Sequence, residues 1–377
     1  MRVLFTSTAG DGHVLPMLPL AGAFAGRGDE VMFAAPVNHR ERVEGLGIRF
    51  IATGPTMEDM GEELAAHRAQ TIDLPASERR PTAFTGRFAQ IEAPKRIEDL
   101  HRVVQTTKPD FVIHESADLA APVAATTAGA VTVNHSFGLP IPEAALRRAA
   151  EAMAPFWHDA GLELDPLGGA YVGSYIHIFP PSLQMEALPV TPAHTYVLRP
   201  AEAGAPAQER RNRPLVYTTL GTSFNEPRLF RVLLDALGSV ECDAVMTIGR
   251  NRDPRDLDPI PGNVSVERYI PQGELLPRCD AVVAHAGSGS VLAALAHGLP
   301  LVLLPQGADQ FENAATCTEH GVAVTVLPAD ISAERVRHAL EQILGDVAYA
   351  DAARSVSAEI ASMSSPAEIA ESIAAQR

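Results

Sequence analysis

The chain has 377 residues and a formal net charge of −16, with a sequence pI near 5.2. This length predicts two domains, each large enough to bury its own core. The acidic balance argues against nucleic acid as a partner, because phosphate contacts need a clustered basic surface. No apolar run approaches the ~18 residues of a membrane span. Three scattered cysteines without CxxC spacing are typical of reduced thiols in a cytoplasmic protein.

The first half of the chain alternates apolar runs with helical stretches, a pattern typical of a parallel sheet covered by helices. The opening MRVLFTSTAGDGH resembles a strand followed by a glycine turn and does not indicate a signal peptide. The pattern predicts a Rossmann-like domain over residues 1–200. Strands are expected at residues 3–6, 31–35, 111–114 and 131–135. Residues 54–96 and 136–175 show no regular periodicity, and we expect them to shape a small-molecule pocket beside the strand ends.

A histidine follows the first expected strand, in the segment STAGDGHVLP. His13 is therefore expected near the start of a helix at the C-terminal edge of the sheet, where ligands bind in α/β folds. The positive end of a helix disfavours imidazolium, and a neutral imidazole can accept a proton from a hydroxyl. Alone, such a histidine is more simply explained as one that bonds a loop carbonyl. The donor segment described below shifts the interpretation toward a general base.

A carboxylate that supports this base is expected in the segment FVIHESAD. A carboxylate fixes the tautomer of the histidine and stabilises its charged form. Glu115 ends a strand at the same sheet edge and is ranked first. Asp118 is the alternative helper, although it could equally be a helix N-terminal charge without a catalytic role. His114 is expected to be buried.

Aromatic residues in the two irregular stretches are candidate walls for an apolar acceptor. Each of them is individually explained as well by an ordinary place in the core. The candidate acceptor-binding set is Gly12, Phe84, Phe88, Phe137 and Trp157.

A segment rich in Pro, Ala and charge, residues 201–213, predicts an exposed linker. Residues 214–377 repeat the alternation of strands and helices, which predicts a second Rossmann-like domain. Here the segment AVVAHAGSGSVLAALAHG predicts a buried strand, a tight turn and a helix. The turn exposes main-chain amides at a helix start, which favours an anion, and Gly287 and Gly289 allow a phosphate to approach closely.

His285 lies at the end of this strand, within reach of such a phosphate. A second strand, PLVLLP, follows, and the loop after it brings Asp309 and Gln310 to the same edge. A carboxylate beside an amide suits sugar hydroxyls. A Gly-Ser turn alone is weak evidence, since such turns serve many structural purposes, but the whole segment is specific.

The segment resembles the donor signature of family 1 glycosyltransferases, which include antibiotic-tailoring bacterial enzymes, and the likeness spans the chain. In that family the signature opens with an aromatic, one residue and then Pro-Gln, matched here by YIPQ. The resemblance implies that Tyr269 lies near the nucleobase of the donor. It also implies that His285 and the turn bind the diphosphate and that the Asp-Gln pair binds the sugar. The candidate donor-binding residues are Gly221, Thr222, Ser223, Tyr269, Ile270, Gln272, His285, Gly287, Ser288, Gly289, Ser290, Asp309 and Gln310.

The chain departs from the family pattern in two places. Plant members carry a ribose-binding Glu where this chain has Ala293, and the span from Tyr269 to His285 is shorter here. Ribose recognition and the base, thymine or uracil, are therefore left open. The family uses a histidine at the position of His13 as general base, and Glu115 stands where many members have Asp.

The resemblance implies an α/β protein of the GT-B fold, with two Rossmann-like domains whose parallel sheets face across an interdomain cleft. A C-terminal helix that packs back on the first domain is typical of the family. The implied activity is metal-independent, inverting transfer of a hexose from a dTDP- or UDP-sugar to a hydroxyl of a lipophilic natural product. No cofactor is expected beyond the nucleotide sugar as co-substrate, and the protein is expected to be a monomer or homodimer.

Other functions fit the sequence less well. A dinucleotide-dependent oxidoreductase is disfavoured because Gly10 and Gly12 are followed by Leu15 instead of the third glycine of the fingerprint. A nucleotide-sugar epimerase, or a catalytically silent binding or activator protein, would share the architecture, but loss of the base would mark the latter. The Asp-x-Asp of a metal-dependent transferase is formally present at Asp256 and Asp258, in a stretch interpreted as a solvated loop.

Overall fold

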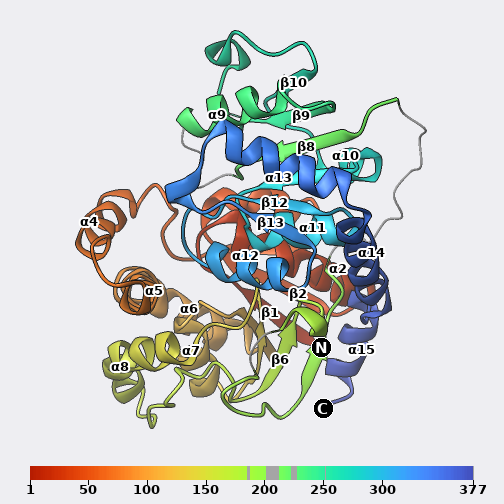
Figure 1. The fold of residues 1–377 in the computed structure, drawn as a ribbon. Coiled ribbons are helices and arrows are strands. Elements are labelled where there is room, and N and C mark those ends of the chain that lie inside the picture. Colours follow the sequence, from red (N-terminus) through yellow and green to blue (C-terminus); the bar gives the residue numbers. More distant parts are fainter. Residues whose placement is uncertain (185–186, 201–211, 222–226, 251, 377) are drawn as a thin grey trace. The chain divides into compact units, whose positions relative to one another are not determined.

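The computed structural model describes residues 1–184, 187–200, 212–221, 227–250 and 252–376. The chain divides into two compact units. Unit 1 comprises Met1–Ile178, Ala187–Leu198 and Ser364–Arg377, and unit 2 comprises Phe179–Glu186 and Arg199–Met363. Most of the expected linker, residues 201–211, lies outside the described residues. Each unit is built around one parallel sheet (Figure 1).

Unit 1 contains a seven-stranded parallel sheet with the order β3-β2-β1-β4-β5-β6-β7. Its central strands are buried on both faces, because helices cover both, and this explains their unbroken apolar runs. The strands are β1 (Arg2–Thr6), β2 (Glu30–Ala35), β3 (Arg49–Ala52), β4 (Phe111–Glu115), β5 (Val131–His135), β6 (Ser174–His177) and β7 (Thr195–Val197).

The C-terminal helix of the chain belongs to unit 1. It packs against α2, and its residues Ile369, Ala370 and Ile373 are buried (Figure 1, where α15 is dark blue). A capping box at Ser365 starts it. The α-helices of unit 1 are α1 (Asp11–Val14), α2 (Leu18–Gly26), α3 (Arg40–Glu44), α4 (Gly61–Thr71), α5 (Ala76–Phe84), α6 (Ala93–Thr107), α7 (Ala120–Thr127), α8 (Glu143–Asp159) and α15 (Pro366–Ala374), with the π-helix η3 (Thr85–Glu92) and the 3-10 turns η1 (Leu15–Met17) and η2 (Val37–His39).

The expectation of irregular structure was wrong for residues 54–96, which are largely helical, and for the part of residues 136–175 that forms one long helix. Residues 54–96 form α4, α5 and η3, and residues 136–175 contain α8. In α4 only Thr71 is buried, so the helix has no apolar stripe and depends on its packing against α5 and η3. Helix α8 does have helical spacing, but three of its six buried residues are alanines, which give a weak hydrophobic signal.

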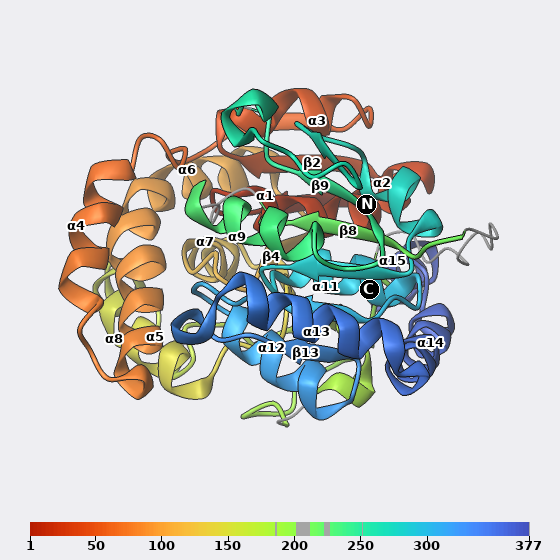
Figure 2. The same ribbon diagram turned by 45° about the horizontal axis from the view of Figure 1, so that its top comes forward.

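Unit 2 contains a six-stranded parallel sheet with the order β10-β9-β8-β11-β12-β13. Helix α9 packs beside α13, and α11 beside α14 (Figure 2). The strands are β8 (Leu215–Thr219), β9 (Asp243–Thr247), β10 (Val264–Glu267), β11 (Ala281–Ala284), β12 (Leu301–Leu303) and β13 (Ala323–Thr325). The α-helices are α9 (Pro227–Leu237), α10 (Gln272–Leu275), α11 (Ser288–Ala296), α12 (Gln310–Glu319), α13 (Ala333–Gly345) and α14 (Val347–Ser362), and the 3-10 turns are η4 (Pro181–Leu183), η5 (Pro254–Leu257), η6 (Leu276–Arg278) and η7 (Pro328–Asp330).

Both sheets share one topology. In each, the first strand lies centrally and the strand order reverses beside it, between β1 and β4 in unit 1 and between β8 and β11 in unit 2. Ligands in open parallel sheets bind outside the carboxyl ends of the strands at such a switch point. His13 follows β1 and Glu115 ends β4, whereas Gly221 follows β8 and His285 follows β11. These four sequence-predicted residues therefore fall at the two switch points.

None of the helices in the described segments is long and apolar enough to cross a membrane. The three cysteines are buried thiols. Burial raises the pKa of the Cys317 thiol to about 12, which keeps it protonated and unreactive.

Candidate active site

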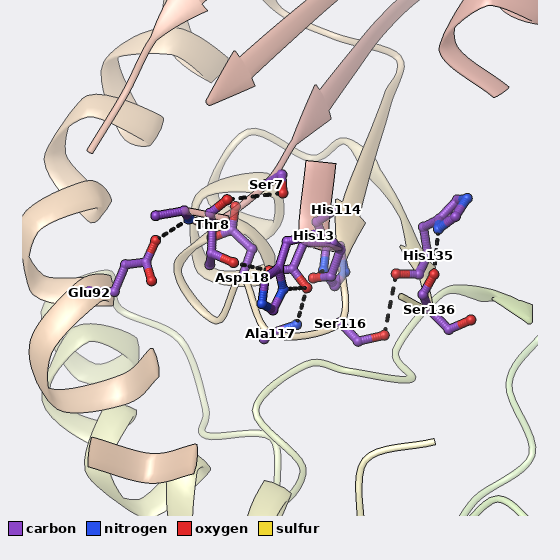
Figure 3. Close-up of polar contacts among 12 residues, drawn as sticks. Ser7, Thr8, His13, Glu92, His114, Ser116, Ala117, Asp118, His135 and Ser136 are labelled. Carbon is purple, nitrogen blue, oxygen red and sulfur yellow. Dashed lines mark hydrogen bonds and ion pairs between the residues drawn. The ribbon is translucent and has the colours of Figure 1, made fainter. Parts of the chain in front are cut away.

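His13 and Glu115 meet at the switch point of unit 1. The short helix α1 directly after β1 places the His13 side chain over the sheet edge, where the residue is 9% exposed. Nδ1 of His13 lies 3.3 Å from Oε2 of Glu115, which is fully buried at the end of β4 (Figure 3). The structure thus brings the predicted base and its first-ranked helper together.

The Glu115 carboxylate is held by further donors. The Thr8 hydroxyl donates to Oε1, and the Ala117 amide donates to Oε2 at 2.7 Å (Figure 3). Burial alone would raise the pKa of Glu115, but the nearby His13 imidazole and these hydrogen bonds outweigh it and lower the pKa to about 2. Glu115 is therefore a carboxylate across the physiological range. An ionised carboxylate beside Nδ1 favours a proton on that nitrogen and leaves Nε2 as the acceptor.

Asp118, the alternative helper, has a different partner. The buried guanidinium of Arg96 lies 2.8 Å from Oδ2 of Asp118, and the Thr6 hydroxyl donates to the same oxygen at 2.5 Å. Arg96 is fully buried and also donates to the carbonyl of Thr53 at 3.1 Å. Asp118 thus neutralises a buried arginine, and of the two helper candidates Glu115 is the one beside His13.

A π-helix fixes the loop that precedes His13. The Ala9 amide donates to Oε1 of Glu92 at 2.6 Å, and the Ala9 carbonyl accepts from Nη2 of Arg87 at 2.8 Å. Arg87 and Glu92 lie five residues apart on η3, so the i→i+5 repeat of a π-helix stacks them on one face. Burial raises the pKa of Glu92 despite the opposing charges of Arg96 and Arg87. Sequence reasoning missed both residues, because no local pattern links them to a loop so distant in the chain.

The predicted acceptor residues divide into two groups. The rings of Phe88 and Phe137 lie 5.4 and 4.5 Å from the His13 ring, and the Phe84 ring lies 5.0 Å from that of Phe88, with the two planes tilted by 49°. Trp157 is only 3% exposed in the core of unit 1, and Gly12 is exposed on α1. The three phenylalanines therefore lie around His13, and the assignment of all five residues to the acceptor stays a prediction.

Other buried histidines near this edge have structural roles. His114 and His135 each place Nδ1 against a main-chain carbonyl of the following residue, at 3.1 and 2.7 Å (Figure 3). Burial lowers the pKa of His135 to about 4, so its imidazole is neutral at physiological pH. The expectation that His114 is buried is met.

The glycine turn of unit 2 begins α11 without a side-chain cap. Gly287 is the N-cap residue, and among the residues that the structure describes no side chain accepts from the first amides of the helix. These amides are available to an anion. Ser288 and Ser290 flank the exposed Gly289 in the first turn.

The His285 ring is enclosed by two glycines. A Cβ added at Gly221 or at Gly287 would lie 2.4 Å from a ring atom of His285, so neither position tolerates a side chain without movement. Gly221 also has a φ of +68°. Burial lowers the pKa of His285 to about 4, against the raising effect of Asp309. A neutral imidazole can donate one hydrogen bond to a phosphate without adding charge.

The loop after β12 faces this turn. The Ser288 hydroxyl donates to Oδ2 of Asp309 at 2.8 Å. The amide oxygen of Gln310 accepts from the main-chain amides of Gln306 at 2.7 Å and Gly307 at 3.2 Å. A hydrogen bond thus joins Asp309 to the glycine turn, while the hydrogen bonds of Gln310 stabilise its own loop.

The residues expected near the nucleobase of the donor follow β10. Tyr269 is 52% exposed, and the guanidinium of Arg250 lies 3.8 Å from its ring centroid. Ile270 is half-buried, and Gln272 begins α10. Thr222 and Ser223 lie outside the described residues. Asp256 and Asp258 of the rival metal motif are exposed in and beside η5.

Comparisons with known proteins point to one family. The family described as erythromycin biosynthesis protein CIII-like, C-terminal domain, matches residues 231–376. The chain is 34% identical to the L-demethylnoviosyl transferase of Streptomyces niveus over 100% of this chain and 98% of that protein. It is 28% identical to the 3-alpha-mycarosylerythronolide B desosaminyl transferase of Saccharopolyspora erythraea, over 98% and 96%.

A solved structure has the same architecture over the whole length. The glycosyltransferase SsfS6 of Streptomyces sp. SF2575, complexed with thymidine diphosphate, is 27% identical and superposes with a TM-score of 0.80 over 99% of both chains. The likeness to full-length relatives, together with two Rossmann-like sheets, confirms the fold and the resemblance predicted from the sequence. The chain therefore belongs to the family 1 natural-product glycosyltransferases of the GT-B fold.

Proposed function

We propose that this glycosyltransferase moves a sugar, with inversion and without a metal, from a nucleoside diphosphate to a hydroxyl of a lipophilic small molecule, with His13 as general base. The pairing of His13 Nδ1 with the buried Glu115 carboxylate, 3.3 Å away, carries the proposal. This pairing leaves Nε2 to take a proton and stabilises the imidazolium that forms.

In the proposed reaction His13 Nε2 removes the proton of the acceptor hydroxyl as the oxygen attacks the anomeric carbon. A new carbon–oxygen bond forms on one face of the sugar while the bond to the diphosphate breaks on the other. The electron pair leaves with the diphosphate, so the anomeric configuration inverts. Glu115 stays ionised throughout, because its pKa of about 2 is too low for it to compete for the proton.

The leaving diphosphate is assigned to the start of α11. The uncapped amides and the neutral His285 provide hydrogen-bond donors for one anion, and the helix dipole attracts its negative charge. These groups could supply the stabilisation that a divalent cation gives in other transferases. Asp309, joined to the same turn through Ser288, is assigned to the sugar hydroxyls.

The acceptor is assigned to the aromatic surface around His13. Three rings, those of Phe84, Phe88 and Phe137, offer apolar contact beside His13, the proposed base. These rings favour a flat, lipophilic acceptor with a hydroxyl that reaches Nε2.

The nucleotide is proposed to be dTDP or UDP. SsfS6 is complexed with thymidine diphosphate, which favours thymine. A thermal-shift panel of dTDP, UDP, ADP and GDP, with EDTA present, tests this assignment. We expect dTDP or UDP to raise Tm by several degrees, since a ligand stabilises the native state according to its affinity. Equal shifts for all four nucleotides, or none without Mg²⁺, would contradict the proposal.

A further inference from the structure

The two loops assigned to the donor share an unusual backbone conformation. Ala286 has a φ of +64° and Ala308 a φ of +54°, in the left-handed region that residues with a side chain seldom adopt. Ala286 lies between His285 and Gly287, and Ala308 directly precedes Asp309. Such conformations persist only where surrounding contacts hold them.

One buried side chain supplies such contacts to both loops. Nδ2 of Asn313, on α12, lies 2.9 Å from the carbonyl oxygen of Ala286, 3.0 Å from Oγ of Ser288 and 3.1 Å from Oδ2 of Asp309. Asn313 is fully buried. Its amide thus joins the turn after β11 to the loop after β12.

These contacts determine how the Asp309 carboxylate is presented. Oδ2 accepts from both Asn313 and the Ser288 hydroxyl, and within the described segments no hydrogen bond reaches Oδ1. One oxygen is therefore committed to the protein and the other is available to a ligand. The two donors also disperse the charge of a carboxylate that lies beside the first amides of α11, where an anion is expected to bind.

We infer that Asn313 is a positioning residue for donor binding. It holds the glycine turn after β11 and the Asp309 carboxylate in a fixed position relative to each other. The inference rests on the proposed function. A neutral amide is required here, because it donates to a carboxylate without adding charge next to a diphosphate. Aspartate has nearly the same shape but lacks the donor and adds a negative charge.

Three variants test the inference by isothermal titration calorimetry with dTDP and UDP as the probes. Asn313→Ala removes the donor, and Asn313→Asp replaces it with a second carboxylate. Thr316→Val is the matched control, because Thr316 is buried on the same helix and its hydroxyl has no hydrogen-bond partner among the described residues. The probe that the wild-type protein binds is titrated at pH 8 and pH 5.5, and each variant is compared with wild type at the same pH.

At pH 8 we expect Asn313→Ala to weaken binding about 10-fold and Asn313→Asp about 100-fold, with Thr316→Val within about twofold of wild type. At pH 5.5 Asn313→Asp should recover to the level of Asn313→Ala or better, because two adjacent carboxyls share one proton and regain a donor. The other titratable groups of these loops, His285 and Glu312, are the same in all variants.

A purely structural role for Asn313 would make the two Asn313 variants unstable without this recovery of Asn313→Asp at pH 5.5. Unchanged binding by Asn313→Ala, or no recovery of Asn313→Asp at pH 5.5, would overturn the inference. Failure of the proposed function is a separate result, in which the wild-type protein binds neither probe.

Discussion

Each unit places a histidine at the switch point of its sheet, after the first strand (β1) in unit 1 and after the fourth strand (β11) in unit 2, and surrounds it with opposite chemistry. In unit 1 His13 lies beside an ionised, fully buried carboxylate, and the same unit contains the buried ion pair of Arg96 and Asp118. In unit 2 His285 is enclosed by two glycines, next to main-chain amides, and burial keeps it neutral with a pKa of about 4. A base must gain a charge during the reaction, whereas a donor to a phosphate must not lose its proton.

The difference extends to the supporting residues. Thr8, Glu92 and Arg87 hold the site of unit 1 with charged or hydroxyl side chains. Unit 2 relies on small residues, on two alanines with positive φ and on the amide of Asn313. In the proposed function, one fold therefore supports proton transfer with buried charge and anion binding with main-chain dipoles.

The comparison predicts that removing the two histidines has separable effects, and His13 gives the largest. We expect His13→Ala to lower the rate of transfer about 10³-fold, because His13 is the group proposed to take the proton of the acceptor hydroxyl. Donor affinity should stay within about twofold of wild type, since His13 belongs to unit 1. Nucleoside diphosphate release with an acceptor chosen from a panel of phenols measures the first quantity, and calorimetry the second. Retention of near-normal transfer would show that another group is the base.

The enclosure of His285 predicts the next largest effect. Gly287→Ala places a Cβ 2.4 Å from Nε2 of His285 and should weaken nucleotide binding about 100-fold by displacing the ring. Gly262→Ala is the control, since a Cβ there meets nothing within 4 Å. Calorimetry with dTDP and UDP measures both. Equal affinities for the two variants would mean that the ring position does not matter to the ligand.

The two carboxylates of unit 1 should separate catalysis from stability. Glu115→Gln is expected to lower kcat about 10-fold to 100-fold, because the amide no longer stabilises the imidazolium. Asp118→Asn leaves the charge of Arg96 buried without its partner and should cost about 3 kcal/mol of stability. Steady-state kinetics and denaturant unfolding of both variants test the contrast. A catalytic loss confined to Asp118→Asn would reverse the assignment of helper.

The smallest expected effect concerns acid stability, in which the two units resemble each other. Burial lowers the pKa of His135 and of His285 to about 4, below that of the unfolded chain. Between about pH 6.5 and 4 the unfolded state binds protons that the folded state excludes, so stability falls as the pH is lowered through this window. We expect Tm to drop by several degrees, and His135→Asn to reduce the slope. A flat Tm over this range would contradict the burial of neutral histidines.

Much of the fold could be predicted from the sequence, because strands buried on both faces are continuous apolar runs such as residues 281–284. The donor segment is contiguous, and its parts lie at one sheet edge as the strand order requires. The ranking of Glu115 over Asp118 as the neighbour of His13 also agrees with the observed geometry.

The remaining features depend on contacts between distant segments. Helix α4 has no apolar stripe, and the π-helix that holds Ala9 arises from an extra residue per turn that leaves no local pattern. Asn313 lies only three residues after Gln310, yet only the packing of α12 against the preceding turn reveals its three contacts. Propensity alone cannot identify such residues.

The place of α15 has a consequence for engineering. Because Ser364–Arg377 belongs to unit 1 and packs against α2, the chain passes between the units more than once. A hybrid enzyme spliced once near residue 200 would bring a foreign last helix to the surface formed by α2. Exchanging the first unit between relatives therefore requires moving its distal fourteen residues, 364–377, in the same gene fusion.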